Sequence, residues 1–300
     1  MKISLMLGNL RQPFEESLHT VQRLNIPAIH LSAGGMWNPA TCDAACRKRL
    51  RALLRRRGLV ISALSRWGGE VDLGEVSQAD QNIADARRTL EMAADLMAEN
   101  GGPGIWQAHI GVMPRTADGP RWDSFVHCAR AIARHGEKVG ACLAVETGPE
   151  PPAVVEKLMR AVESPGLRVN YDPANLILWP ALLHTVGRLV EKFGKPPTPY
   201  DKETAIREFE PVEGVRRLGR YIVHTHAKDA RVEGGVDRES PLGQGWVDWP
   251  RYLRLLKENG YQGYLAIERE TGADPVADIA AAAEFLRAQL RLLQSGGTEN

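Results

Sequence analysis

The sequence lacks several features that would each place it in a class of proteins. No apolar run approaches the ~20 residues that a membrane-spanning helix needs. The apolar start MKISLML reaches Gly8 and Arg11 too soon for a signal peptide. No segment of strand character is followed by the GxGxxG or GxxxxGK[ST] loop of the nucleotide-binding folds. We therefore expect a protein without membrane contact, and the missing loops argue against an open doubly wound sheet as the alternative fold.

Cysteine is scarce, and its spacing is uninformative for metal binding. The four cysteines, Cys42, Cys46, Cys128 and Cys142, contain no CxxC pair. Cys42 and Cys46 are one helical turn apart, which we interpret as small-residue packing. A reducing, cytoplasmic setting is the expectation that follows.

An excess of charge of one sign is also missing. The 38 Lys and Arg residues are balanced by 37 Asp and Glu residues. A protein that binds duplex nucleic acid usually has a basic excess on one face, so this balance argues against nucleic acid as a partner. The one basic run, Arg47–Arg57, carries Leu50, Leu53 and Leu54 at helical spacing and is interpreted as a solvated helix face.

Short apolar runs alternate with segments of helical periodicity along the whole chain. We expect strands at Ile3–Leu7, Ala28–Ser32, Val60–Leu64, Ile105–Ile110, Cys142–Glu146, Arg168–Asp172, Tyr221–His226 and Tyr264–Glu268. We expect helices at Pro13–Leu24, Cys42–Arg57, Gln78–Glu99, Asp123–Val139, Ala153–Val162, Val215–Leu218, Pro250–Asn259 and Pro275–Leu293. Alternation of strand and helix predicts a parallel sheet. Eight repeats in 300 residues predict an α/β protein with one (β/α)8 TIM barrel domain over residues 1–300.

Two connections are longer than the minimal repeat requires. The chain from Pro173 to Gly219 has room for an extra helix and a loop, and its proline-rich part Lys195–Glu203 is expected to help cover the barrel mouth. After the seventh strand, Asp248 followed by Pro250 predicts a helix start.

The strand in YIVHTHAKD puts ionisable side chains where burial is expected. His224, His226 and Lys228 alternate along Tyr221–Asp229 and so share one face. Burying three such groups is costly unless something binds them. A histidine satisfied by a backbone carbonyl in an ordinary core is the alternative.

Four consecutive strand ends carry a carboxylate or an imidazole. They are Glu146, Asp172, His226 and Glu268. Enzymes with this fold place their chemistry at these ends. Three converging carboxylates repel one another unless a cation neutralises them. This oxygen-rich set favours one divalent ion, with Mn²⁺ first and Mg²⁺, Co²⁺ or Zn²⁺ as alternatives. A salt-bridge layer that uses Lys228 and Arg231 stays open.

Several motifs together resemble the xylose-isomerase-like sugar phosphate isomerase/epimerase superfamily. The motifs are ETG at Glu146, NYDPAN at Asn170–Asn175, HTHAKDA at His224–Ala230, PLGQGWVDW at Pro241–Trp249 and GYLAIERE at Gly263–Glu270. The resemblance implies a TIM barrel whose metal is held by Glu146, Asp172, His226 and Glu268. In the ketose epimerases of this superfamily the two metal-bound glutamates are also acid and base, which would assign those roles to Glu146 and Glu268.

The sequence departs from the epimerase pattern at one substrate position. Those enzymes carry a histidine three residues after the metal aspartate, where this chain has Asn175, which cannot carry a proton at neutral pH. Arg231 lies near the place of a substrate arginine. The fold alone does not select among isomerases, epimerases, dehydratases, lyases and endonuclease IV.

Our functional prediction is an isomerase or epimerase acting on a small-molecule carbohydrate or cyclitol. A proton would move next to a carbonyl through a metal-stabilised enediolate. The alternative is a lyase or dehydratase that acts on a keto-sugar, an inosose or a 3-oxo-glycoside by the same chemistry, with Lys228 protonating the leaving group. A homo-oligomer and a non-catalytic sugar-binding module also stay open. Candidate substrate-binding residues are Trp67, His109, Asn175, Lys228 and Arg231; His109 shares a strand face with Gln107.

Overall fold

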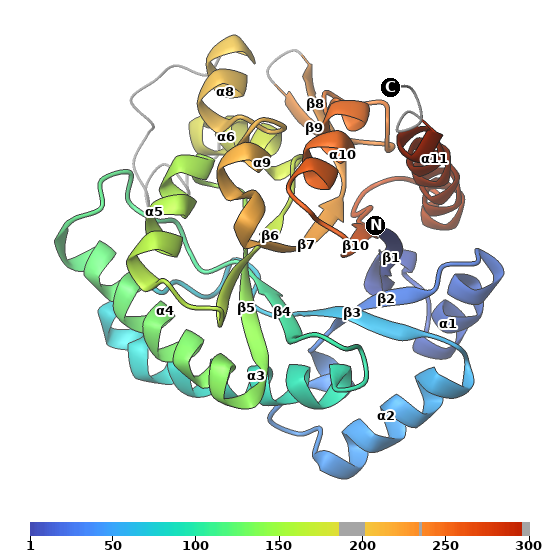
Figure 1. Ribbon diagram of the computed structural model, residues 1–300, viewed down its shortest axis with the longest axis horizontal. Helices are drawn as coiled ribbons and strands as arrows, with labels where there is room; N and C mark the ends of the chain where they lie inside the picture. The colour runs from blue at the N-terminus through green and yellow to red at the C-terminus, as the bar shows by residue number, and fades with distance from the viewer. Residues whose placement is uncertain (186–201, 234–235, 296–300) are drawn as a thin grey trace.

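The computed structural model describes residues 1–185, 202–233 and 236–295 (Figure 1). Its centre is a barrel of eight parallel strands that closes in the order β1-β10-β7-β6-β5-β4-β3-β2. The strands are β1 (Lys2–Met6), β2 (Ala28–Ser32), β3 (Val60–Ser65), β4 (Gly104–Ala108), β5 (Ala141–Glu146), β6 (Leu167–Tyr171), β7 (Ile222–Ala227) and β10 (Tyr264–Ile267). The predicted TIM barrel is confirmed, and each strand lies where an apolar run predicted it.

Helices surround the barrel, as Figure 1 shows. They are α1 (Phe14–Arg23), α2 (Ala44–Arg56), α3 (Ala79–Met97), α4 (Gly119–Val139), α5 (Pro152–Val162), α6 (Asn175–Thr185), α8 (Lys202–Phe209), α9 (Gly214–Leu218), α10 (Trp249–Glu258) and α11 (Pro275–Ser295). Short 3-10 turns are η1 (Leu7–Leu10), η2 (Gly35–Trp37), η3 (Val76–Gln78) and η4 (Gly219–Tyr221). Apolar side chains of the strands and of the inner helix faces form one buried core.

Local chemistry sets several helix ends. The Asp248 side chain accepts a hydrogen bond from the Arg251 N–H at the start of α10, with Pro250 in the first turn, which confirms the predicted helix start. α4 ends at Gly140, whose φ of 76° lies in the left-handed region that glycine adopts without strain. These signals fix where the strand that follows or precedes each helix enters the barrel.

The long connection after β6 contains α6, α8 and α9, so the extra helical structure expected there is present. Of the predicted mouth cover, Lys195–Glu203, residues 195–201 lie outside the described residues, and the cover stays a prediction. In the described parts of the chain we find no helix that is both long and apolar enough to span a membrane.

Two features were not predicted. An antiparallel hairpin of β8 (Asp229–Glu233) and β9 (Val236–Ser240) follows β7, where we expected no further strand. The structure also joins Cys42 and Cys46 in a disulfide, so their interpretation as packing residues was wrong. Two cysteines one helical turn apart can be bridged when the first lies just before the helix, as Cys42 does, with a Cα–Cα distance of 5.3 Å.

Candidate metal centre

The register of the barrel strands produces two layers of polar side chains. Asn170 on β6 pairs with His224 on β7, and Asp172 and His226 follow two residues later along the same two segments. Alternate residues of a strand point to the same side, so each pair forms its own layer. On the other side of β7, Ala266 of β10 pairs with His226, and Glu268 comes two residues later. The ends of three adjacent strands thus bring Asp172, His226 and Glu268 together.

Glu146, at the end of β5, joins these three side chains. One potential ligand atom from each of Glu146, Asp172, His226 and Glu268 lies within 4.8 Å of the others. Nδ1 of His226 lies 3.0 Å from Oε1 of Glu146, 2.9 Å from Oε2 of Glu268 and 3.6 Å from Oδ2 of Asp172. All four side chains are buried. The four residues predicted as metal ligands thus converge on one point.

The hydrogen bonding of this group is incomplete. Over the described residues, Oδ2 of Asp172, Oε2 of Glu268 and Nδ1 of His226 are buried and make no hydrogen bond of good geometry, although the atoms lie close together. A buried polar atom without a partner costs about 1–3 kcal/mol. A divalent cation would use these lone pairs at once, and a set of three carboxylates and one imidazole suits such an ion. The residues present therefore fit a divalent metal.

The pKa values of Asp172 and His226 are both raised above their usual values. Burial raises the pKa of Asp172 to about 6, and the negative charges of Glu268 and Glu146 add to that increase. Burial alone would lower the pKa of His226, but Glu268 and Glu146 hold it well above its usual value. Without a cation, a proton on the imidazole is what balances the crowded carboxylates.

Glu146 has three further partners. Gln107 on β4 donates to its Oε2, and Nε2 of His109 lies 3.2 Å from the same oxygen. The side-chain amide of Asn175, at the start of α6, donates to Oε1 at 3.0 Å. Burial would raise the pKa of Glu146, yet His109 and His226 hold it below its usual value. Two predicted substrate residues, His109 and Asn175, therefore border this carboxylate.

Glu268 has a cationic neighbour instead. Nζ of Lys228 lies 3.5 Å from Oε2 of Glu268 and also contacts the carboxylate of Glu270. Burial would raise the pKa of Glu268, but His226 and Lys228 hold it well below its usual value. Lys228 is itself buried, and the three carboxylates Glu268, Asp172 and Glu270 keep its pKa above the usual value although burial opposes this.

Two predicted substrate residues lie elsewhere. Trp67 is 6% exposed, donates its indole N–H to Asp85 at 2.8 Å and packs edge-on against Trp106. These contacts hold its indole against α3 and Trp106, and the substrate role predicted for Trp67 stays a prediction. Arg231 lies half-buried on β8 of the unpredicted hairpin, and its role stays a prediction.

Some neighbours of the centre were missed. Glu270, which contacts Lys228, was not predicted because it lies beyond the last strand. Trp179, whose ring centroid lies 6.1 Å from that of His109, belongs to α6, a helix without a predicted residue range. His30 was missed on β2. A histidine within the buried apolar run AIHLS was the signal that could have identified it.

Comparisons with known proteins agree with this geometry. The family model described as xylose isomerase-like TIM barrel matches residues 18–289. The uncharacterized protein YfiH of Bacillus subtilis is 24% identical over 96% of this chain and 98% of its own length. The L-ribulose-5-phosphate 3-epimerase UlaE of Escherichia coli is 39% identical, but over only 23% of this chain and 25% of the epimerase.

Solved structures share the fold. A xylose isomerase domain protein from Planctomyces limnophilus has a TM-score of 0.72 at 24% identity, covering 93% of this chain and 92% of its own. The probable 3-DHS dehydratase AsbF of Bacillus anthracis has a TM-score of 0.70 at 16% identity, over 96% and 99% of the two chains. A xylose isomerase-like TIM barrel protein from Mycobacterium smegmatis, solved in complex with magnesium, has a TM-score of 0.69 at 19% identity. The match covers 98% of this chain and 96% of the other. With the family model covering most of the sequence and the barrel closed around the converging carboxylates, the chain belongs to the xylose isomerase-like TIM barrel family.

Proposed function

We propose that the protein is a divalent-metal-dependent isomerase or epimerase of a sugar or cyclitol, which moves a proton at a carbon next to a carbonyl. The observation that carries this proposal is the convergence of Glu146 and Glu268 on one nitrogen of His226 from strands on opposite sides of β6 and β7. Two carboxylates that flank one point can exchange protons with one carbon from two directions, as an epimerisation requires.

Glu146, Asp172, His226 and Glu268 would hold the ion. When bound, the metal supplies positive charge that makes a proton next to a carbonyl more acidic. We propose Mn²⁺ first because the donor set is rich in carboxylate oxygens, with Mg²⁺, Co²⁺ and Zn²⁺ as alternatives. The magnesium bound by the Mycobacterium smegmatis relative supports a hard divalent ion.

Glu146 and Glu268 are the proposed acid and base. Both have pKa values below the usual value, so both are ionised at neutral pH and able to accept a proton. Gln107 and Asn175 orient Glu146 through hydrogen bonds to its two oxygens. Lys228 does the equivalent for Glu268 by an ion pair. Each carboxylate is therefore held in place by neighbours that the other does not share.

His109, Asn175, Lys228 and Arg231 are the proposed substrate contacts. His109 is the most open of the groups bordering Glu146, with a side chain 25% exposed, and it can donate to a substrate hydroxyl. The partial match to an L-ribulose-5-phosphate 3-epimerase supports a ketose as the substrate class.

A lyase or dehydratase acting on a keto-sugar, an inosose or a 3-oxo-glycoside is the second candidate. The observation that favours it is Lys228, a buried cation 3.5 Å from Glu268 that could protonate a departing oxygen. The structural likeness to a probable dehydratase supports the same chemistry.

The test is a substrate panel in D₂O with Mn²⁺ present. Ketoses, aldoses, their phosphates, inososes and 3-oxo-glycosides are incubated with the protein, and the carbon-bound proton next to the carbonyl is followed by NMR. Isomerisation or epimerisation gives a rearranged sugar that contains deuterium. Elimination gives loss of water or an alcohol and a new conjugated absorbance. If no compound exchanges its proton, both candidates are refuted.

A further inference from the structure

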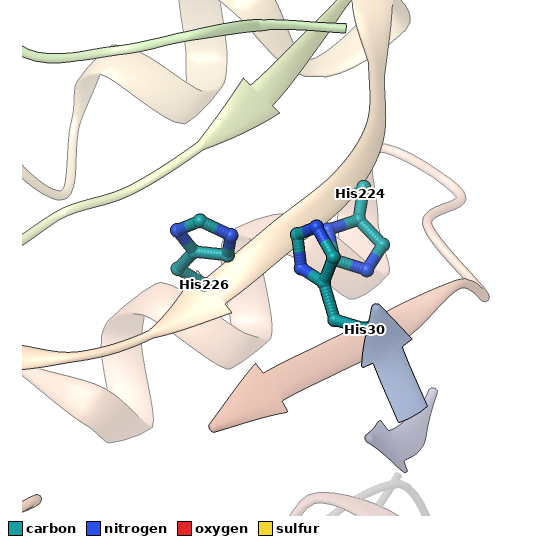
Figure 2. A group of neighbouring side chains, drawn as sticks. All are labelled: His30, His224 and His226. Carbon is teal, nitrogen blue, oxygen red and sulfur yellow. The ribbon is translucent and has the colours of Figure 1, made fainter. Parts of the chain in front are cut away.

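The layer below the metal centre contains a third buried histidine, His30 of β2. Figure 2 shows the ring of His30 between the rings of His224 and His226. Its centroid lies 4.8 Å from that of His224 and 5.2 Å from that of His226. Ring nitrogens of the three residues lie within 4.8 Å of one another. The three rings are therefore close enough to share protons, directly or through one bridging atom.

His30 has unused hydrogen-bonding capacity. It is 1% exposed, and within the described part of the chain neither ring nitrogen makes a hydrogen bond of good geometry. A neutral imidazole offers one donor and one acceptor. The backbone of Leu64 lies close enough to interact with the donor, which leaves the acceptor nitrogen without a partner, and an unpaired acceptor is costly in a core. Something in the immediate surroundings is expected to pair with the acceptor.

His226 supplies the complementary group. Its Nδ1 faces the carboxylates of Glu146 and Glu268, so its Nε2 must carry the ring proton once Nδ1 binds a metal. Nε2 is buried and, like the nitrogens of His30, has no hydrogen-bond partner in the described residues. A metal-bound histidine almost always donates its second N–H to some acceptor.

His224 is already committed to other partners. Its Nδ1 lies 2.8 Å from Oδ1 of Asn170, an acceptor, so Nδ1 carries the proton and Nε2 is a lone pair. That lone pair faces the hydroxyl of Ser62 at 3.3 Å. Because Nδ1 of His224 carries the proton, the tautomer of His224 is fixed. His30 is then the ring that can accept a hydrogen bond from His226.

We propose that His30 is a positioning residue for the metal ligand His226. Its ring accepts the N–H of His226 Nε2, directly or through one buried water, and so keeps the Nδ1 lone pair of His226 pointed at the carboxylates. This inference rests on the metal centre proposed above. It assigns no direct contact with substrate to His30.

A second metal ion bound by the three histidines is the competing explanation. That ion would require His226, already bound through Nδ1, to lose its remaining ring proton. It would also place two positive charges among ligands that include no carboxylate. Because His226 keeps one ring proton after binding the first metal through Nδ1, a hydrogen bond to His30 is favoured over a second metal ion. The two arrangements predict different numbers of bound metal ions per chain.

The first experiment compares two substitutions of His30 by calorimetric titration of Mn²⁺. His30→Leu removes the acceptor, and we expect Mn²⁺ affinity to fall about 10–100-fold, the effect typical of losing a partner of a metal-bound histidine. His30→Gln keeps an acceptor oxygen and should restore most of the affinity. Ser4→Ala changes a buried side chain whose Oγ lies 3.0 Å from Oγ of Ser62, and it should leave affinity unchanged. Equal affinity in wild type and His30→Leu would overturn the proposal.

The second experiment uses the wild-type protein, so it does not depend on the variants folding. Ring ¹⁵N NMR of the Mg²⁺-loaded protein should show His226 protonated at Nε2 and unprotonated at Nδ1; the reverse would contradict the assigned role. Zinc analysis should give one equivalent per chain. Two equivalents in the wild type and one in His30→Leu would favour a second ion bound by the three histidines. A wild-type protein that binds no metal would instead refute the metal centre itself, and the role of His30 with it.

Discussion

Replacing Glu268 with Gln tests the centre with the least change of shape. The amide keeps the volume of the side chain but removes the negative charge that lies 2.9 Å from Nδ1 of His226 and 3.5 Å from Nζ of Lys228. Because Asp172 and Glu146 remain, the site keeps part of its attraction for a cation. We expect weaker metal binding and loss of turnover in a protein that still folds.

The expected size follows from charge. Two unit charges ~4 Å apart interact by about 4 kcal/mol at an effective dielectric constant of ~20. At about 1.4 kcal/mol per factor of ten, that loss corresponds to a rise of roughly 10³-fold in the Kd for Mn²⁺. Turnover should fall further, because removing an acid-base group costs an additional 10²–10⁴-fold or so. The fold depends on the barrel core, so the circular dichroism spectrum should stay unchanged.

Glu270 provides the matched control. It contacts the same Lys228, but its side chain is 57% exposed and it lies outside the converging group. Glu270→Gln should therefore bind Mn²⁺ within a few-fold of wild type by titration calorimetry. If Glu268→Gln also binds Mn²⁺ normally and turns over, or if both variants lose metal equally, the assignment of Glu268 as a ligand is wrong.

Three further predictions concern residues other than the four converging ones. Burial raises the pKa of the Glu150 carboxyl to about 8, whereas in the unfolded chain this carboxyl loses its proton near pH 4.5. Between these two pH values the folded protein therefore binds one proton more than the unfolded chain. The free energy of unfolding should consequently fall as pH rises from about 4.5 to 8. Glu150→Gln, which keeps an acceptor for the Met113 N–H, should flatten this dependence and raise stability at pH 8 by on the order of 3 kcal/mol, measured by urea unfolding. Lys228→Met should bind Mn²⁺ at least as tightly as wild type, since a neighbouring cation is lost, while kcat falls at least 100-fold or so; unchanged kcat would remove Lys228 from the mechanism. Trp67→Phe should lower stability by about 1 kcal/mol through the lost bond to Asp85; a raised KM in this variant would support the predicted substrate contact, and an unaltered KM would argue against it.

The sequence predicted the barrel well because its signals are local. Each strand is a short apolar run such as Ala28–Ser32, and each helix has periodic apolar residues and end signals such as Asp248 with Pro250. The convergence of Glu146, Asp172, His226 and Glu268 could be predicted because a barrel aligns strand ends, so polar residues that follow the apolar runs meet there.

What the sequence did not predict depends on contacts between distant segments. The direction of the Trp67 side chain is set by Asp85, a partner on α3 that no local pattern reveals. The β8–β9 hairpin is held by long-range bonds, in which Asp229 accepts from the backbone N–H groups of Gly243 and Gly245. The pairing of His30 with His224 and His226 needs the closed barrel, because β2 and β7 are not neighbours in the sheet.

The central claim is that a metal held by the converging residues enables Glu146 and Glu268 to move a carbon-bound proton. The most direct measurement is the rate of deuterium uptake next to the carbonyl of a panel substrate that turns over in D₂O, first with metal removed by a chelator and then with Mn²⁺ restored. The account predicts no uptake without metal, full recovery on adding Mn²⁺, and uptake lost in both Glu146→Gln and Glu268→Gln. Uptake that persists without metal, or in both variants, would contradict it.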